Sequence, residues 1–422
     1  MFRQMRYIIF LMWMLMSVCS FCQDVNTANR VIDDLCQDAF AGRGYVANGD
    51  QLAASYLAEK YKEMNLSGFT ADYLQPFNFS VNTVKVSALS IDGTVLKPGY
   101  DYMVAPGSPS FSGEWPVFYV SPKMLSSSRL VSKVKKAVKK GYLPVLAHVD
   151  TKNTEVSKNI EQLRRCLSGQ PIAFLKSRLT WGVSTRQSDY LELWINDAAF
   201  DPFAESINVR VESSYIPSYT SNNVIGYVEG TTFPDSFLVL CGHYDHLGKM
   251  GEAIFYGAND NASGIAMMLD LAHHFTQNPM KYSILFIAFG GEEAGLLGSL
   301  HYVKHPLVPL SKTKFVFNMD LMGSGEDGAT VVNGKVYKTY YDRLVRINEE
   351  QEYLPRLKSR GKASNSDHYF FSEAGVPSFF MYLMGKYKYY HTPEDNAENL
   401  ELGEYYNRTF QLIRDFVVSL DN

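Results

Sequence analysis

The sequence of 422 residues is poor in cysteine, which limits the kinds of site that it can form. Beyond the first 22 residues it has Cys36, Cys166 and Cys241, and their spacing selects no disulfide. Cys241 lies in an apolar run, where we expect it in the core. This part of the sequence has no Cys-x-x-Cys pair, so it lacks the thiolate spacing typical of structural zinc sites.

The sequence also has no strong excess of positive or negative charge, no apparent internal repeat and few long apolar runs. The chain has 40 basic and 44 acidic residues, a formal net charge of −4, which gives no electrostatic basis for binding nucleic acid. After residue 22, no apolar run is long enough to span a bilayer. We therefore expect no nucleic acid and no stable membrane partner, and the sequence leaves the oligomeric state open.

The first 22 residues predict a signal peptide. Arg3 and Arg6 precede an apolar stretch, residues 7–16, that is too short to span a bilayer. Cleavage near residues 20–22 would leave an exported protein, periplasmic or extracellular. The alternative is a lipoprotein signal acylated at Cys19, but the three residues before Cys19 fit that pattern poorly.

The rest of the chain is long enough for one large domain with an insertion. We assign residues 23–80 and 212–422 to a catalytic domain. Short alternating runs predict a β-rich lobe inserted between them, over residues 81–211.

The second part of the catalytic domain alternates apolar strands with helices. Such alternation predicts an α/β fold, with a mostly parallel central sheet and helices on both faces. The predicted strands cover residues 223–228, 236–241, 281–289, 314–319 and 377–383, and the predicted helices cover residues 263–275, 297–303, 339–351 and 404–419.

Histidines and carboxylates follow these strands where each one ends. Because the carboxyl ends of parallel strands meet at one edge of a sheet, we expect the side chains to lie close together. Imidazole and carboxylate without thiolate suit zinc, with cobalt or manganese as substitutes. A single ion would not need this many carboxylates, whereas two ions that share one carboxylate would. The residues are His243, Asp245, Asp260, Glu292, Glu293, Asp320 and His391.

Each of these features alone has an ordinary structural explanation. Asp260 could cap a helix, the Glu292–Glu293 pair could form a solvated turn, and a single His-x-Asp is common. Their occurrence after separate apolar strands is what favours a metal site.

Five motifs carry a resemblance to a known family. In order, they are GHYDHLG, GANDNASG, GGEEAGLLGS, NMDLMG and YHTPEDN. They resemble the motifs of the co-catalytic di-zinc aminopeptidases, a family grouped with glutamate carboxypeptidases and the transferrin receptor ectodomain. The segment that starts DAFAGRGYVANGD resembles the opening turn and helix of this family. Within the lobe, PVFYVSPKML and AVKKGYLPVLAHV resemble pieces of a protease-associated insert in degenerate form.

The resemblance implies a role for each metal-ligand candidate. His243 and Asp320 would bind the first of two zinc ions. Glu293 and His391 would bind the second, and Asp260 would bridge the two.

The resemblance also implies three catalytic residues and peptide substrates. Glu292 would be the general base that acts on a water bridging the two zinc ions, and Asp245 would orient His243. Tyr390 would help to polarise the substrate carbonyl, or it is a packed aromatic residue. Asn261 stands where the family often has aspartate, at a position that is not a ligand. Together these roles predict an exported metallo-aminopeptidase that hydrolyses the N-terminal peptide bond.

Three other functions compete with this one. A glutaminyl cyclase-like transferase uses a single zinc and lacks part of the ligand set. A non-catalytic, receptor-like binding module should have lost ligands or the base, whereas Glu292 is present. A glutamate-type carboxypeptidase needs cationic groups for a substrate carboxylate, and the sequence does not place them. The preferred N-terminal residue of the substrate also stays open.

Overall fold

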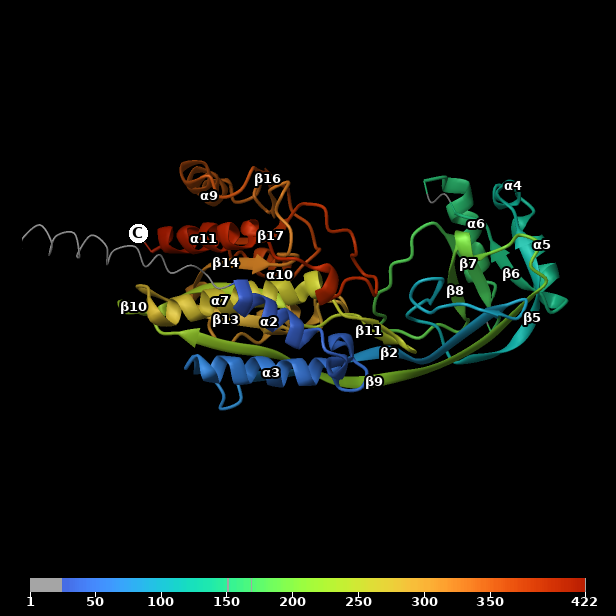
Figure 1. Cartoon of the computed structure of the whole chain (residues 1–422), viewed down its shortest axis with the longest axis horizontal. Coiled ribbons are helices and arrows are strands. Elements are labelled where there is room, and N and C mark those ends of the chain that lie inside the picture. The colour runs from blue at the N-terminus through green and yellow to red at the C-terminus, as the bar shows by residue number, and fades with distance from the viewer. Residues whose placement is uncertain (1–24, 150–151, 168, 422) are drawn as a thin grey trace, which may run out of the picture.

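The computed structural model describes residues 25–149, 152–167 and 169–421, which form an elongated molecule (Figure 1). A main body and a smaller lobe are joined by two long strands, β2 (Leu74–Ile91) and β9 (Ser206–Val228). The predicted signal peptide lies outside the described residues. Among these residues, none of the helices combines the length and the apolar character needed to cross a membrane.

The main body is built on one mixed sheet with the strand order β2–β9–β13–β10–β14–β17–β15–β16. Strands β13, β10, β14 and β17 run parallel. Strand β9 is antiparallel to β13 and β2, and β15 is antiparallel to β17 but parallel to β16. This sheet confirms the predicted α/β fold. The bounds are β10 (Phe233–His243), β13 (Tyr282–Phe289), β14 (Thr313–Met319), β15 (Ala329–Val332), β16 (Leu357–Ser359) and β17 (Ser378–Leu383).

Helices cover both faces of the sheet because the central strands are apolar on both sides. Alternate residues of β10 point to opposite faces, so Leu240 joins one core cluster and Cys241 joins the other. The first face is covered by α2 (Val25–Leu35), α3 (Gly49–Glu63), α7 (Ser263–Gln277), α9 (Lys338–Gln351) and α11 (Glu404–Ser419). The second face is covered by α8 (Leu297–Lys304) and α10 (His368–Glu373).

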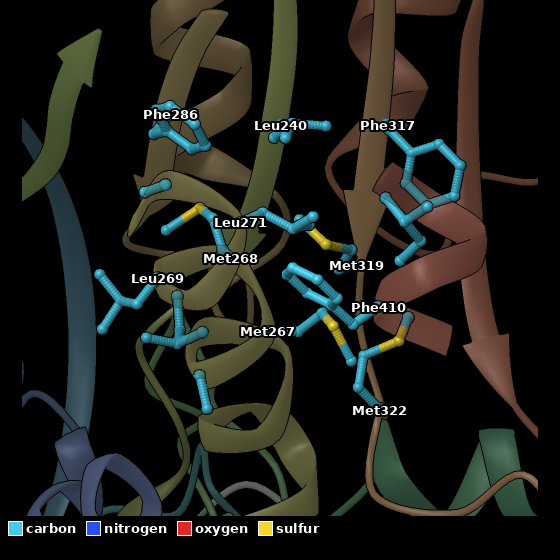
Figure 2. Close-up of a cluster of buried hydrophobic side chains, with 14 of the residues drawn as sticks. Leu240, Met267, Met268, Leu269, Leu271, Phe286, Phe317, Met319, Met322 and Phe410 are labelled. Carbon is cyan, nitrogen blue, oxygen red and sulfur yellow. The ribbon is translucent and has the colours of Figure 1, made fainter. Parts of the chain in front are cut away.

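Helix α7 is buried along almost its whole length, because it lies between the sheet and other helices. Figure 2 shows Met267, Met268 and Leu271 of this helix among Leu240 and Phe317 of the sheet. Full burial of such a side chain stabilises the fold by about 1.5–3 kcal/mol. The helix that follows the Asp260 turn is therefore held firmly against the sheet.

The lobe has a second sheet and its own helices. Strands β5 (Phe111–Val120), β6 (Leu143–Leu146), β7 (Ile172–Lys176) and β8 (Glu192–Asn196) are parallel, and β4 (Tyr102–Val104) is antiparallel to β8. Helices α5 (Leu130–Lys139) and α6 (Thr154–Arg164) pack on it. Residues 81 and 211 fall inside β2 and β9, which continue from the body into the lobe, so the domain limits stay a prediction.

The cysteines of the described residues form no disulfide: Cys36, Cys166 and Cys241 are free. Cys241 is buried in β10, as its apolar surroundings predict.

Candidate active site

The structure brings the predicted site residues together at the carboxyl edge of the parallel strands. His243 is the last residue of β10, and Asp320 directly follows β14. Glu292 and Glu293 lie three and four residues beyond the end of β13. Asp260 lies in the η3 turn (Ala258–Ala262) before α7, and the remaining members, Asp245 and His391, lie in the loops after β10 and β17.

The first cluster of donors surrounds the imidazole of His243. Its Nε2 lies 3.3 Å from Asp260 Oδ1 and 3.4 Å from Asp320 Oδ1. Its Nδ1 lies 3.0 Å from the backbone carbonyl of Asp245, which can only accept a hydrogen bond. In the neutral ring, Nδ1 therefore carries the proton and the lone pair on Nε2 faces two carboxylates.

The second cluster surrounds His391 in the same way. Its Nε2 lies 3.2 Å from Asp260 Oδ2 and 3.4 Å from Glu293 Oε2, while its Nδ1 donates to the backbone carbonyl of Trp181 at 2.9 Å. Asp260 thus gives one carboxylate oxygen to each cluster. His391 has a left-handed backbone, with φ of 59°, and the N–H of Trp181 donates to its carbonyl at 3.0 Å. Two reciprocal hydrogen bonds to the lobe hold this residue in an uncommon conformation.

A further histidine, His246, belongs to the second cluster and was not assigned a role from the sequence. Its Nδ1 lies 2.9 Å from Glu293 Oε1, and its Nε2 is buried without a hydrogen-bond partner. With Asp260 and Glu293 it forms a set of donors that could hold a metal ion. The sequence could have indicated a role for His246, because it is the second histidine of the GHYDHLG motif.

The donor set fits a metal cation. The Nε2 atoms of His243 and His391 each face two carboxylates. A nitrogen lone pair repels a carboxylate unless a proton or a metal ion lies between the two groups. Burial lowers the pKa of His391, but Glu293 and Asp260 outweigh burial and raise it to about 11. The imidazole and carboxylate groups of His243, Asp260 and Asp320 lie within 4.8 Å of one another, which suits zinc.

The two adjacent glutamates have opposite electrostatic surroundings. Desolvation raises the pKa of Glu292 well above its usual value, and the carboxylates of Glu293 and Asp367 act in the same direction. Burial would also raise the pKa of Glu293, but the charge of His391 and the hydrogen bond with His246 lower it to about 2. Different environments can give two like carboxyl groups different roles.

Asp245 holds the two glutamates through their backbone. Its carboxylate accepts hydrogen bonds from the N–H groups of Glu292 and Glu293, each at 3.1 Å, and from the hydroxyl of Tyr45. The same carboxylate lies 3.8 Å from His243 Nδ1, farther than the Asp245 carbonyl. Asp245 therefore contacts the imidazole through its carbonyl and the Glu292 turn through its side chain.

Three residues fix the turn that carries Asp260. The carboxylate of Asp395 accepts from the N–H of Asp260 at 3.1 Å. Asn261 donates to the carbonyl of Met319 at 3.0 Å, a contact that an aspartate could not make, which is consistent with a non-ligand role. Gly257 has φ of 63°, and a Cβ there would lie 2.1 Å from the Asp260 carbonyl, so the turn requires glycine.

Arg43 is a positioning residue in the segment DAFAGRGYVANGD, which the sequence comparison indicated as an opening turn. Its side chain is fully buried and donates to the carbonyls of Tyr244 and Gly257, each at 2.7 Å, and of Leu35. A buried charge must be satisfied in this way. Arg43 ties the amino-terminal turn η1 (Asp38–Arg43) to both metal-ligand loops.

A cavity of about 210 Å³ opens beside the metal-ligand candidates. Tyr390 lines it and stacks on His391, with ring centroids 3.8 Å apart. The other lining residues beyond the candidate ligands and Glu292 are Leu321, Arg360, Asn365, Phe380 and Tyr382.

Part of the chain is similar in sequence to known peptidases. The model of Peptidase family M28 matches residues 223–417. Aminopeptidase YwaD of Bacillus subtilis is 34% identical over 194 residues, which cover 43% of this chain and 41% of that protein. A vacuolar membrane protease of Candida glabrata is 28% identical over 45% of this chain and 20% of its own length. The matched stretch thus spans less than half of these curated relatives.

The fold extends further than the sequence similarity. The solved structure of a zinc aminopeptidase from Bacillus subtilis has a TM-score of 0.70 and 22% identity, over 94% of this chain and 95% of that one. An aminopeptidase from Aneurinibacillus sp. has a TM-score of 0.64 and 19% identity, over 94% and 93% of the two chains. Residues 223–417, which match the model of Peptidase family M28, hold every metal-ligand candidate.

Proposed function

We propose that this protein is an exported aminopeptidase with two zinc ions, which removes the amino-terminal residue from peptides by hydrolysis. The observation that carries the proposal is the position of Asp260. Its two carboxylate oxygens face two different imidazoles, 3.3 Å from His243 and 3.2 Å from His391. Such an arrangement suits one carboxylate shared by two ions.

The chain offers a complete donor set for each ion. His243 and Asp320 would hold the first ion, with one oxygen of Asp260. Glu293 and His391 would hold the second with the other oxygen, and His246 would orient Glu293 from behind. Zinc in this position would supply Lewis acidity toward the carbonyl oxygen of the scissile bond and toward water.

Glu292 would move the proton. It lines the cavity but has no neighbouring imidazole as close as those of Glu293, and burial raises its pKa, which makes its carboxylate a stronger base. A general base of this kind accepts a proton from the attacking water and gives it to the nitrogen of the leaving amine. Water adds to the peptide bond, and a free amino acid and a shortened peptide are released.

Asp245 and Tyr390 would assist these steps. Asp245 holds the backbone of Glu292 through the hydrogen bond at 3.1 Å, which keeps the base at the cavity. Tyr390 exposes 47% of its surface beside His391, where its hydroxyl is available to polarise the substrate carbonyl.

Export rests on the first 22 residues alone. Arg3, Arg6 and the apolar stretch of residues 7–16 have the pattern of a cleaved signal peptide. We also propose residues 23–80 with 212–422 as the catalytic domain and residues 81–211 as the inserted lobe. The two core clusters that lie largely in the lobe support this division.

One experiment tests the function. The mature chain is assayed on amino-acid p-nitroanilides, dipeptides and the same substrates with an acetylated amine, and the zinc content of the sample is measured. We expect two zinc ions per chain and hydrolysis of the substrates with a free amine. Hydrolysis of the acetylated substrates would contradict an aminopeptidase. One zinc ion, with cyclisation of amino-terminal glutamine, would favour the glutaminyl cyclase-like alternative.

A further inference from the structure

The cavity holds a charged side chain that the proposed reaction does not use. Arg360 lines it beside the carboxylates of Asp260, Glu292, Glu293 and Asp320. Among the described residues that line this cavity, Arg360 is the only lysine or arginine. It reaches the site from the loop after β16, far from every metal-ligand candidate in the sequence.

The backbone of Arg360 is fixed, while its guanidinium remains available. Its N–H donates to the carbonyl of Val331 at 2.8 Å, and its carbonyl accepts from Lys335 at 3.0 Å. The guanidinium donates to the hydroxyl of Tyr382 at 3.4 Å and forms no ion pair within the described part of the chain. Arginine has five N–H donors in a planar fork that matches a carboxylate. Most of these donors are therefore free for a ligand.

The neighbours of Arg360 suit a small ligand with a charged end. Asn365 offers an amide to the same cavity, whereas Leu321 and Phe380 provide apolar surface. The volume of about 210 Å³ is below the ~300–1,000 Å³ of pockets for drug-sized ligands. A ligand of one or two amino-acid residues could reach from the metal-ligand cluster to Arg360, whereas a long chain would have to leave the cavity.

We propose that Arg360 is a specificity-determining residue that binds a carboxylate of the substrate. This inference rests on the proposed peptidase function. Two sources could supply the carboxylate: the side chain of an amino-terminal aspartate or glutamate, or the α-carboxylate of a dipeptide. Either source places a negative charge beside Arg360 and leaves the free amine for the metal-ligand cluster.

Two matched pairs of substrates separate these sources. Glutamyl and glutaminyl p-nitroanilides differ only in a side-chain carboxylate, and leucyl-glycine and its amide differ only in the α-carboxylate. Charged hydrogen bonds contribute enough for a preference of roughly 10- to 100-fold in kcat/KM. We expect this preference for the charged member of one of the two pairs.

Three variants assign the preference to Arg360. Arg360→Gln should abolish it, and Arg360→Lys, which keeps the charge but not the fork, should keep part of it. Lys358→Gln is the matched control, since Lys358 is an exposed cation on β16 that does not line the cavity. Circular dichroism would show that each variant is folded, as expected for exposed side chains.

The outcomes distinguish this inference from the proposed function. Two results would overturn the role of Arg360 and leave the proposed peptidase function unaffected. The first is hydrolysis of leucyl substrates without a preference in either pair, and the second is a preference that Arg360→Gln retains. If no peptide is hydrolysed, the proposed function fails, and calorimetry with glutamate and glutamine tests Arg360 alone. Equal affinity for the two amino acids and for leucyl-glycine and its amide would then reject the carboxylate site.

Discussion

The body and the lobe are both built on parallel strands and differ in what their strand ends carry. Both have four parallel strands covered by helices. In the body, histidines and carboxylates converge where the strands end, whereas the described residues of the lobe contain no such group of potential metal ligands. A parallel sheet therefore provides an edge where side chains can meet, and the side chains determine whether a site forms there.

The lobe nevertheless reaches the site through one loop. Trp181 lies between β7 and β8, and its backbone exchanges two hydrogen bonds with His391. Its ring stacks on Phe255 of the body at 4.8 Å, and its Nε1 donates to the Val104 carbonyl of the lobe at 2.8 Å. The lobe therefore supports a residue of the second donor cluster, although it supplies no donor side chain among the described residues.

The largest effect should come from the body, at Glu292. Glu292→Gln keeps the shape of the side chain but removes its ability to accept a proton. We expect kcat to fall by roughly 10²- to 10⁴-fold while the zinc content is unchanged. Glu401→Gln, at an exposed position, is the control. Loss of zinc from Glu292→Gln would show that this residue is a ligand.

The adjacent residue should respond differently. Glu293→Gln removes a charge that contacts His391 at 3.4 Å and His246 at 2.9 Å. Loss of a contact to a metal ligand typically lowers metal affinity by roughly 10- to 100-fold. Because Glu293 is a proposed ligand itself, we expect zinc affinity at one of the two sites to fall by more than this. Zinc titration measures this change, and excess zinc should restore part of the activity. Unchanged zinc affinity would contradict the assignment.

A smaller effect should come from the contact between the lobe and His391. Trp181→Ala removes the ring that anchors the loop, so the carbonyl that accepts from His391 is held less firmly. We expect affinity for one zinc ion to fall by roughly 10- to 100-fold. Trp115→Ala, elsewhere in the lobe, should leave zinc binding unchanged. If both variants bind zinc as the unaltered protein does, the lobe does not support the metal site.

The smallest effect on activity should come from the core of the lobe. Leu193 on β8 and Leu240 on β10 are both buried, so Leu→Ala at either position should destabilise its region by about 2–5 kcal/mol. We expect only Leu240→Ala to lower kcat/KM, since β10 carries His243. Thermal unfolding and kinetics of the two variants test this difference, and an equal loss of activity would contradict it.

The body could be predicted from the sequence more fully than the lobe. Its central strands are long apolar runs whose ends carry polar motifs, so position and chemistry are both local properties of the chain. Strands β15 and β16, with four and three residues, were missed because such short segments have no periodicity. Most strands of the lobe are also short, with three to five residues in β4, β6, β7 and β8.

The residues of the site also divide into those that the sequence predicts and those that it does not. The ligand candidates and Glu292 could be predicted because each follows an apolar strand or opens a helix within a motif. Trp181 and Arg360 reach the site from distant segments, and neither lies in a motif. Their contribution depends on tertiary contacts, which a single sequence does not reveal.

The two strands that join the regions have a consequence for folding kinetics. Leu74 lies opposite Val224 and Ile91 opposite Ile207, so paired residues are more than a hundred positions apart in the chain. Closing such a loop has a large entropic cost, which a folded lobe would reduce by bringing β2 and β9 together. We therefore expect the lobe to fold early. Strand β9 would then be in place to dock against β13, and the edge of the sheet that holds the donors would form last.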